Sequence, residues 1–354
     1  MMTLPPLPYD YDYISNDSET NNNPFIDNSL PGELNVTEKK VPLKYMYAVL
    51  YSMVFLLGVS LNILVICMTC KMKKTTSTIW FLGLAVTDFI FCLFLPFAII
   101  YALYDFNWVF GLIMCKLNSY VMFISMFSTA LILTLLSIDR CFSAIADGCV
   151  RKCCTALTAT NMVWATWFAS AILSTPSLAL RDIANKSGKT VCYDNYGSGF
   201  LNINTVEGEI RVKTVIATRF IFGIVLPLFI ICLGSCLVSF PKNSYRFKSS
   251  RTYRIVRVMI FLYFLCWAPY HVFMLMALNA PTYMHKIFAY GLPITTVLAV
   301  ANSCINPIVY IFMGGDLKMS WMEDAFFTGV QDSGEEKSAE EMKPLKKNDT
   351  EAQK

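Results

Sequence analysis

The amino-acid sequence predicts an all-α membrane protein, a seven-transmembrane helix bundle with a short amphipathic eighth helix. Its composition is apolar, with 55% hydrophobic and 15% charged residues and a mean hydropathy of +0.50. A typical soluble domain carries about 25% charged residues. The apolar residues fall into long blocks separated by short polar stretches. Because a helix needs about 20 apolar residues to cross the hydrocarbon of a bilayer, these blocks indicate membrane spans.

Seven blocks are long enough to span: Lys44–Met68, Ile79–Leu103, Leu112–Ala144, Ala156–Leu180, Val215–Phe240, Ile255–Ala280 and Ile287–Met313. As buried helices of a soluble protein, they would leave almost no amphipathic helices to cover them, which favours the membrane. We expect residues 44–313 to form the bundle. The net charge of +4 is small and gives no indication of nucleic-acid binding.

The segment before the first block, residues 1–43, is rich in Pro, Asn and Asp, so we expect a disordered extracellular tail. It lacks the basic start and apolar core of a cleavable signal peptide. Three glycosylation sequons begin at Asn16, Asn35 and Asn185. Tyr9, Tyr11 and Tyr13 alternate with acidic residues. This pattern suits tyrosine sulfation and capture of a basic protein, or a plain solvated acidic tail.

An odd number of spans places the two termini on opposite sides of the membrane. With the N-terminus outside, the basic residues gather in the inner loops: Lys71, Lys73, Lys74, Arg151, Lys152, Lys242, Arg246, Lys248, Arg251 and Arg254. Lys39, Lys40 and Lys44 run against this rule, so the orientation depends on the other loops. The positive-inside rule thus predicts a multi-pass protein with an extracellular N-terminus.

Polar residues interrupt the first two spans. Asn62 lies inside the first block, where an amide must find partners on other helices. Asp88 lies near the middle of the second block, where a carboxylate is most costly. We expect it to be neutral or to share a cation or water cluster in the bundle interior. Pro96 should kink the second span because it removes a backbone hydrogen bond.

The third span ends in the adjacent acid and base Asp139 and Arg140. Such a pair is costly to bury, so we expect it at a membrane face and in a functional role.

At the opposite end of this span lies Cys115, and Cys192 follows in the long external segment after the fourth span. They are the two cysteines near the oxidising outer face, which favours a Cys115–Cys192 disulfide. The external segment from Arg181 to Lys213 should form a solvated lid.

Arg219 lies about one helical turn inside the fifth block. The guanidinium could snorkel to the outer interface, or it could face the cavity of the bundle and pair with an anionic ligand group. The apolar flanks favour the cavity. In the sixth block, Pro269 should bend the helix as a hinge.

The seventh block contains amides, a hydroxyl and a proline within Ala301–Tyr310, and these polar groups can meet Asp88 and Asn62 in the interior. Beyond it, residues 314–325 should form the amphipathic eighth helix, and residues 326–354 a disordered cytoplasmic tail.

The only histidines are His271 and His285, and no pairing of nucleophile and base stands out, so we expect no zinc site and no enzyme. We find no repeated halves typical of transporters.

Six stretches, taken together and in order, resemble the rhodopsin-like G-protein-coupled receptors: GVSLN, LAVTD, Cys115, IDRC, CWAPY and NPIVY. The stretches NWVFGLIMCKL, STPSLALRDIANKSGKTVCYDN and TRFIFGIVLP are similar to the chemoattractant branch, which holds receptors for chemerin, formyl peptides and anaphylatoxins. Within that branch, the chain most resembles the chemerin receptors.

This resemblance implies roles for particular residues. The implied ligand site contains Asn118, Phe123, Arg219, Trp267 and Tyr270. The implied G-protein coupling site contains Asp139, Arg140 and Tyr310. The implied sodium and water site contains Asn62, Asp88, Thr129, Asn302, Ser303 and Asn306. Apart from a sodium ion at Asp88, no metal or cofactor is expected.

The resemblance also implies partners: an extracellular peptide or protein ligand, a heterotrimeric G protein of the inhibitory type, arrestin and membrane lipids. It implies a location in the plasma membrane. One departure concerns Ser235, which stands where the family usually has a tyrosine that helps to hold the active state. This departure favours a non-signalling decoy receptor, whereas the intact Asp139-Arg140 and NPIVY favour signalling. A formyl-peptide, anaphylatoxin or lipid-mediator receptor of the same branch is a further alternative.

Overall fold

The computed structural model describes residues 34–145, 155–186, 188–196, 206–239, 251–278 and 285–313. Within these ranges, seven helical segments are long and apolar enough to cross a membrane: Lys44–Lys71, Thr76–Leu103, Gly111–Ser143, Ala156–Leu180, Val206–Cys236, Thr252–Ala277 and Gly291–Met313. The predicted seven-helix bundle is therefore confirmed. The expected eighth helix and the C-terminal tail lie outside the described residues.

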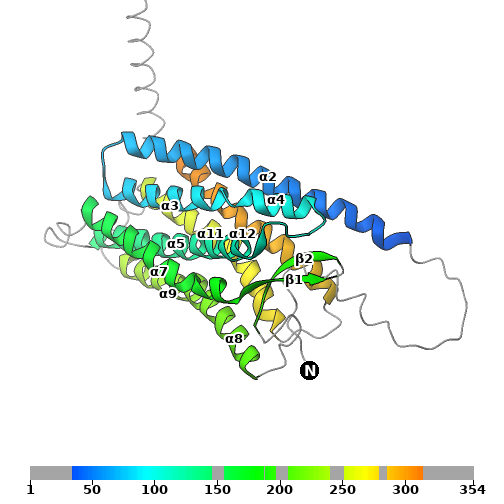
Figure 1. Cartoon of the computed structure of the whole chain (residues 1–354). Coiled ribbons are helices and arrows are strands. Elements are labelled where there is room, and N and C mark those ends of the chain that lie inside the picture. Colours follow the sequence, from blue (N-terminus) through cyan, green and yellow to red (C-terminus); the bar gives the residue numbers. More distant parts are fainter. Residues whose placement is uncertain are drawn as a thin grey trace, which may run out of the picture.

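The elements follow the chain as a bundle of antiparallel neighbours with a small hairpin at one end (Figure 1). They are α2 (Leu34–Lys71), α3 (Thr76–Cys92), α4 (Leu95–Leu103), α5 (Gly111–Ile145), α7 (Ala156–Leu180), β1 (Arg181–Lys186), β2 (Lys189–Asp194), α8 (Val206–Phe220), η1 (Ile221–Val225), α9 (Leu226–Ser239), α11 (Arg251–Ala277) and α12 (His285–Met313). Helix α2 begins at Leu34, before the first apolar block, and so extends into the predicted tail.

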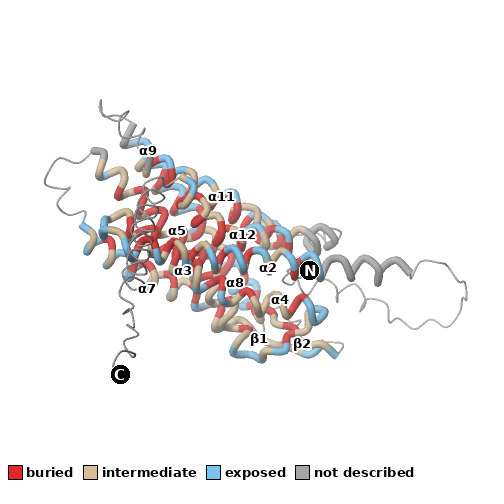
Figure 2. Tube along the Cα trace, turned by 90° about the horizontal axis from the view of Figure 1, so that it is seen from above, coloured by how far each residue is buried: buried red, intermediate tan, exposed pale blue. Residues whose placement is uncertain are grey.

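Helix α5 is the centre of the bundle. In its most apolar window 67% of the residues are buried, against 28% for α7, which faces outward. Figure 2 shows the buried residues concentrated along the middle of the bundle. The largest fully buried side chains of α5 are Met126, Phe127, Ile132, Leu133 and Leu136. Any polar group on this helix must therefore find its partner inside the protein.

The second span is broken as Pro96 predicted. Helix α3 ends at Cys92, and α4 begins at Leu95 with the proline in its first turn. Proline is tolerated there because its missing N–H would have no intrahelical partner in any case. At its other end, α3 begins with a capping box in which the Thr75 and Thr78 side chains exchange hydrogen bonds with each other's backbone N–H at 3.2 and 3.0 Å.

The fifth span begins earlier than the sequence predicted. Helix α8 starts at Val206, so residues 206–213 continue the helix and do not belong to a solvated lid. Two pairs along this turn explain the extension: Glu207 with Arg211 at 3.6 Å and Glu209 with Lys213 at 2.5 Å. Such i,i+4 pairs, with the acid nearer the N-terminus, stabilise exposed helix by a few tenths of a kcal/mol each.

Within the fifth span, η1 (Ile221–Val225) is a π-helical turn that was not predicted from the sequence. A proline ring clashes with the carbonyl four residues before it, which for Pro227 is the carbonyl of Gly223. The widened turn relieves this clash, as π-bulges do elsewhere in helices. The freed Gly223 carbonyl accepts a hydrogen bond from the Tyr263 hydroxyl of α11 at 2.9 Å. This bond ties α11 to the fifth span in the middle of the bundle.

The external segment after the fourth span forms an antiparallel hairpin in which Arg181 pairs with Asp194 and Ile183 with Cys192. The expected disulfide joins Cys192 to Cys115 of α5, with Cα atoms 5.7 Å apart. The Thr190 carbonyl also accepts from the Trp108 backbone N–H at 2.7 Å. The disulfide prediction is confirmed, whereas the solvated lid is in part an ordered hairpin fixed to the bundle.

We predict that replacing both Cys115 and Cys192 by alanine lowers the free energy of unfolding by about 2–4 kcal/mol, because the bridge closes a long loop. Thermal unfolding of the purified protein measures this loss. A Cys67→Ala variant, which removes an exposed free cysteine, is the matched control and should unfold like the wild type. Equal unfolding temperatures for the double variant and the control would contradict the prediction.

Candidate functional site

A pocket of ≈ 90 Å³ lies beneath the hairpin at the end of the bundle that carries the disulfide. Its walls come from α2, α3, α4, α5, α8, α11 and α12, and both strands of the hairpin contribute to it. Four of the five residues predicted for the ligand site line it: Asn118, Phe123, Arg219 and Tyr270. The bundle therefore brings together, in one pocket, residues from three separate helices.

Arg219, in the last turn of α8, is only 6% exposed. Its guanidinium carbon lies 3.6 Å from the centre of the Phe123 ring, and its Nη2 donates to the Ser177 hydroxyl at 3.3 Å. Its Nη1 has no hydrogen-bond partner, and no described residue forms an ion pair with it. The side chain thus faces the interior of the bundle and does not snorkel to the surface. A buried guanidinium with a free donor is a site for an anion.

Two further charged residues, which were not predicted for the ligand site, line the pocket. Arg181 and Asp194 form an ion pair, with Nε and Oδ1 3.2 Å apart. Arg181 also donates to the Ser119 hydroxyl at 3.0 Å and to the Cys192 carbonyl at 3.3 Å. The pocket therefore holds two guanidinium groups and one carboxylate and carries a net positive charge. The position of Asp194, two residues after the bridged Cys192, is the sequence signal that could have placed it here.

Trp267, the fifth predicted ligand residue, is buried but does not line the pocket. Its ring packs edge-on against Tyr270, with the centroids 5.9 Å apart, and its Nε1 has no described partner. A ligand in the pocket would contact Tyr270 and reach Trp267 through it. Trp267 thus lies between the pocket and Tyr263, the residue that bonds to the Gly223 carbonyl. The ring centroids of Trp267 and Tyr263 are 6.4 Å apart.

Below the pocket, Asp88 is the centre of a polar cluster and is fully buried. Its Oδ2 accepts from the Asn306 amide at 2.9 Å, and its Oδ1 accepts from the Ser125 hydroxyl at 3.5 Å. The Asn62 amide donates to the Ser303 carbonyl at 2.9 Å, which links α2 to α12. Ser125 was not predicted. It stands one turn before Thr129 on the same face of α5, a spacing that could have pointed to it.

Several oxygens of the residues predicted for the sodium and water site have no hydrogen-bond partner among the described residues. They are Asn62 Oδ1, Thr129 Oγ1, Asn302 Oδ1 and Asn306 Oδ1, and all are buried. A buried oxygen without a partner is costly, so water or a cation is expected to satisfy it. Carboxylate, amide and hydroxyl oxygens are also the ligands that hard cations prefer. The donor set around Asp88 therefore fits a small cation together with water.

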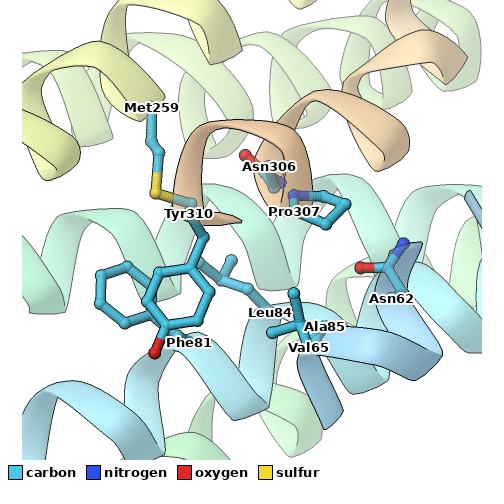
Figure 3. Close-up of a pocket in the computed structure, with 9 residues that line it drawn as sticks. All are labelled: Asn62, Val65, Phe81, Leu84, Ala85, Met259, Asn306, Pro307 and Tyr310. Atoms are coloured by element: carbon cyan, nitrogen blue, oxygen red, sulfur yellow. The ribbon is translucent and has the colours of Figure 1, made fainter. Parts of the chain in front are cut away.

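A cavity of ≈ 10 Å³, which is the size of about one water molecule, lies beside this cluster. Figure 3 shows Asn62 and Asn306 bordering it from one side, with the Tyr310 ring beside Phe81 on the other. The two ring centroids are 4.1 Å apart. Tyr310, predicted for G-protein coupling, thus packs into the space between α3, α11 and α12.

At the opposite end of the bundle, Asp139 and Arg140 pair with each other. Arg140 Nε donates to Asp139 Oδ2 at 3.0 Å, and Nη2 contacts the same oxygen. Asp139 is buried and Arg140 is half-buried. The acid and the base at the end of α5 therefore neutralise each other, and the remaining guanidinium donors of Arg140 face the cavity that it lines.

Two of the three glycosylation predictions and all three sulfation predictions lie outside the described side chains: Asn16, Asn35, Tyr9, Tyr11 and Tyr13. Asn185 is exposed on β1, where a glycan could be attached.

At the same end of the bundle, Lys44 of α2 forms an ion pair at 2.6 Å with Asp105, in the turn after α4. This contact holds the pKa of the Asp105 carboxyl below its usual range.

Comparison with known proteins identifies the family. The model of the 7 transmembrane receptor (rhodopsin family) matches residues 61–310. Chemerin-like receptor 1 from Bos taurus is 38% identical over 300 residues, which cover 81% of this chain and 82% of that protein. Chemerin-like receptor 1 from Homo sapiens is 38% identical over 76% of this chain and 75% of its own length.

Chemerin-like receptor 2 from Homo sapiens is 32% identical over 78% of this chain and 79% of its own length. These relatives are receptors, which agrees with the prediction that the chain is not an enzyme. Seven spans in such a family make it a multi-pass membrane protein. The chain belongs to the rhodopsin family of seven-transmembrane receptors, and within that family it is similar to the chemerin-like receptors.

Proposed function

We propose that this protein is a plasma-membrane receptor for an extracellular peptide or protein of the chemerin type, and that it signals through inhibitory G proteins. The names of its relatives, chemerin-like receptors 1 and 2, support the ligand class. The observation that carries the proposal is the buried guanidinium of Arg219, which has a free donor in the outer pocket. The distribution of basic residues supports an extracellular N-terminus and a cytoplasmic C-terminus.

The charge and size of the pocket define what part of a ligand would enter it. Two guanidinium groups against one carboxylate favour an anionic group, and a free C-terminal carboxylate matches the planar fork of Arg219. A volume of ≈ 90 Å³ accommodates only the tip of a peptide. The rest of the ligand would then lie outside, against the hairpin. Asn118 and Ser119, on the wall formed by α5, would offer further hydrogen bonds to the tip.

Signalling would follow from a shift between two arrangements of the bundle. In the structure described above, Arg140 is held by Asp139, and α11 is held by the hydrogen bond from Tyr263 to Gly223. A ligand that displaces Tyr270 would act on α11 directly, because Tyr270 and the packed Trp267 both belong to that helix, which contains Pro269 as a hinge. Movement of α11 would open the end of the bundle at Arg140 to the G protein. Arrestin would bind the same open end.

A decoy receptor is the second candidate, because Ser235 stands where the family usually has tyrosine. Ser235 donates its hydroxyl to the Ile231 carbonyl of its own helix at 2.8 Å. Its short side chain cannot extend across the bundle toward Arg140 as a tyrosine could. A receptor for a carboxylated lipid mediator is a further alternative, since a lipid carboxylate would satisfy Arg219 equally well.

We also propose that the cluster around Asp88 holds a sodium ion. Asp88, Ser125, Thr129 and Asn302 would supply oxygens for it, and water would complete its shell. A cation there would neutralise the buried carboxylate, and it would favour the closed arrangement of the bundle. The ion would therefore oppose agonist binding.

We predict that Arg219→Ala weakens binding of a chemerin C-terminal peptide by roughly 30-fold or more, because loss of a buried charge-assisted pair costs at least about 2 kcal/mol. Amidating the peptide C-terminus should weaken binding to the wild type by a similar factor. It should have little further effect on the variant, because the two groups would form one pair. Competition binding on membranes measures all four affinities.

Arg211→Ala is the matched control, since Arg211 is an exposed arginine on the same helix α8. It should leave the affinity unchanged. If amidation weakened binding to the Arg219 variant as strongly as to the wild type, the carboxylate would have another partner and the proposed pairing would be wrong.

A second test concerns Asp88→Asn, which removes the charge that a sodium ion would neutralise. In the wild type, agonist affinity should fall when sodium chloride replaces an equal concentration, about 0.15 M, of choline chloride. In the variant, the two salts should give the same affinity. An unchanged sodium effect in the Asp88→Asn variant would rule out this site for the ion.

A screen of chemerin peptides in cells tests signalling itself, with cAMP inhibition and arrestin recruitment as parallel readouts. A signalling receptor should lower cAMP, and pertussis toxin should abolish that response. Ligand binding without either readout would support the decoy. A response to carboxylated lipids and not to peptides would support the lipid-mediator receptor.

A further inference from the structure

A larger cavity of ≈ 460 Å³ lies at the other end of the bundle, between α9 and α11. Its volume falls in the range of small-molecule sites. The floor is α5, which contributes the Ser137, Arg140 and Cys141 side chains. The walls are mostly apolar and include Ile224, Leu228, Ile231, Ile260 and Phe264. No part of the proposed peptide site or of the Asp88 cluster lines this cavity.

Two residues that line the cavity are also exposed on the lipid-facing side of their spans. Leu228 on one wall is 44% exposed, and Phe261 on the other is 65% exposed. Both belong to membrane spans, so their exposed faces contact hydrocarbon. Small side chains hollow the space between the walls: Ser235 on α9, Ala268 on α11 and Ser137 on α5. An occupant could therefore enter sideways from the bilayer.

The length of the cavity matches a lipid chain. Its lining on α11 extends from Tyr253 to Ala268, which corresponds to about 22 Å of helix at 1.5 Å per residue. One leaflet contributes about 15 Å to the hydrocarbon core. An acyl chain that begins at the membrane face can therefore lie along the groove over most of its length.

The end of the groove nearest the membrane face is basic. Arg257 lines it, is exposed and forms no ion pair with any described residue. Its guanidinium carbon lies 5.8 Å from the centre of the Tyr253 ring, and Tyr253 lines the same cavity. Arg140 on the floor is paired with Asp139, so Arg257 supplies the unbalanced charge. An apolar groove that ends in an unpaired arginine is complementary to an anionic amphiphile.

We propose that this cavity binds an anionic glycerophospholipid from the leaflet at the Arg140 end of the bundle. One acyl chain lies between α9 and α11, and the headgroup phosphate pairs with Arg257. The second chain remains in the bilayer, against the exposed faces of Leu228 and Phe261. This site does not depend on the identity of the peptide ligand, and it shares Arg140 with the end of the bundle proposed for the G protein.

Lipid retention by the purified full-length protein tests the proposal. The protein is equilibrated with equal amounts of phosphatidylglycerol and phosphatidylcholine that carry the same acyl chains, and bound lipid is counted by native mass spectrometry. Wild type should retain phosphatidylglycerol about 10-fold better, which corresponds to about 1.4 kcal/mol. Arg257→Gln should reduce that preference nearly to equality. Arg254→Gln, which removes an exposed arginine outside the groove on the same helix, should keep it.

Filling the groove tests the position of the acyl chain. Ser235→Phe and Ala268→Phe each place a large side chain in the cavity, and each should abolish retention of both lipids. Either variant suffices if the other fails to fold, and thermal unfolding selects the folded one. Equal retention of the two lipids by the wild type would overturn the proposal. The proposal would also be overturned if Arg257→Gln and Arg254→Gln reduced the preference for phosphatidylglycerol equally. The same holds if the variants with a filled cavity retained as much lipid as the wild type.

Discussion

Hydrocarbon offers no hydrogen-bond partners, so every polar group in a span must be satisfied inside the protein. Seven helices satisfy the backbone, and the polar side chains that remain converge on α5 at the centre of the bundle. Asp88 meets Ser125 and Asn306, Tyr263 meets the free Gly223 carbonyl, and Asp139 meets Arg140. Each of these contacts joins or ends a helix, and together they fix how the spans are arranged around α5.

The groups that this constraint leaves unsatisfied mark the proposed sites. Arg219 has a free donor in the outer pocket, and four oxygens of the proposed sodium and water site have no partner among the described residues. These two places lie at different depths of one bundle. Tyr270, which lines the outer pocket, belongs to α11, and its ring continues along that helix through Trp267 to Tyr263. A group bound in the pocket would therefore contact α11 directly.

Much of the bundle could be predicted because its signals are local. Blocks of apolar residues gave the spans, and Pro96 gave the break between α3 and α4. The disulfide followed from the two cysteines near the outer face. The hairpin, the early start of α8 and η1 could not be placed in this way. They depend on contacts between segments, such as the bond of Tyr263 to Gly223, or on side-chain pairs in a stretch without an apolar signal.

The candidate site was predicted in part for the same reason. A single charge in an apolar helix identified Arg219, whereas Arg181 and Asp194 reach the pocket because the hairpin pairs them and the disulfide fixes that hairpin to α5. A structure of the protein with its peptide ligand would locate the ligand carboxylate directly. We expect that carboxylate within about 3 Å of the Arg219 guanidinium, at the distance of a charge-assisted hydrogen bond. A bound ligand whose carboxylate lies elsewhere, with Arg219 still covering Phe123 and its Nη1 unpaired, would show that Arg219 does not recognise the peptide.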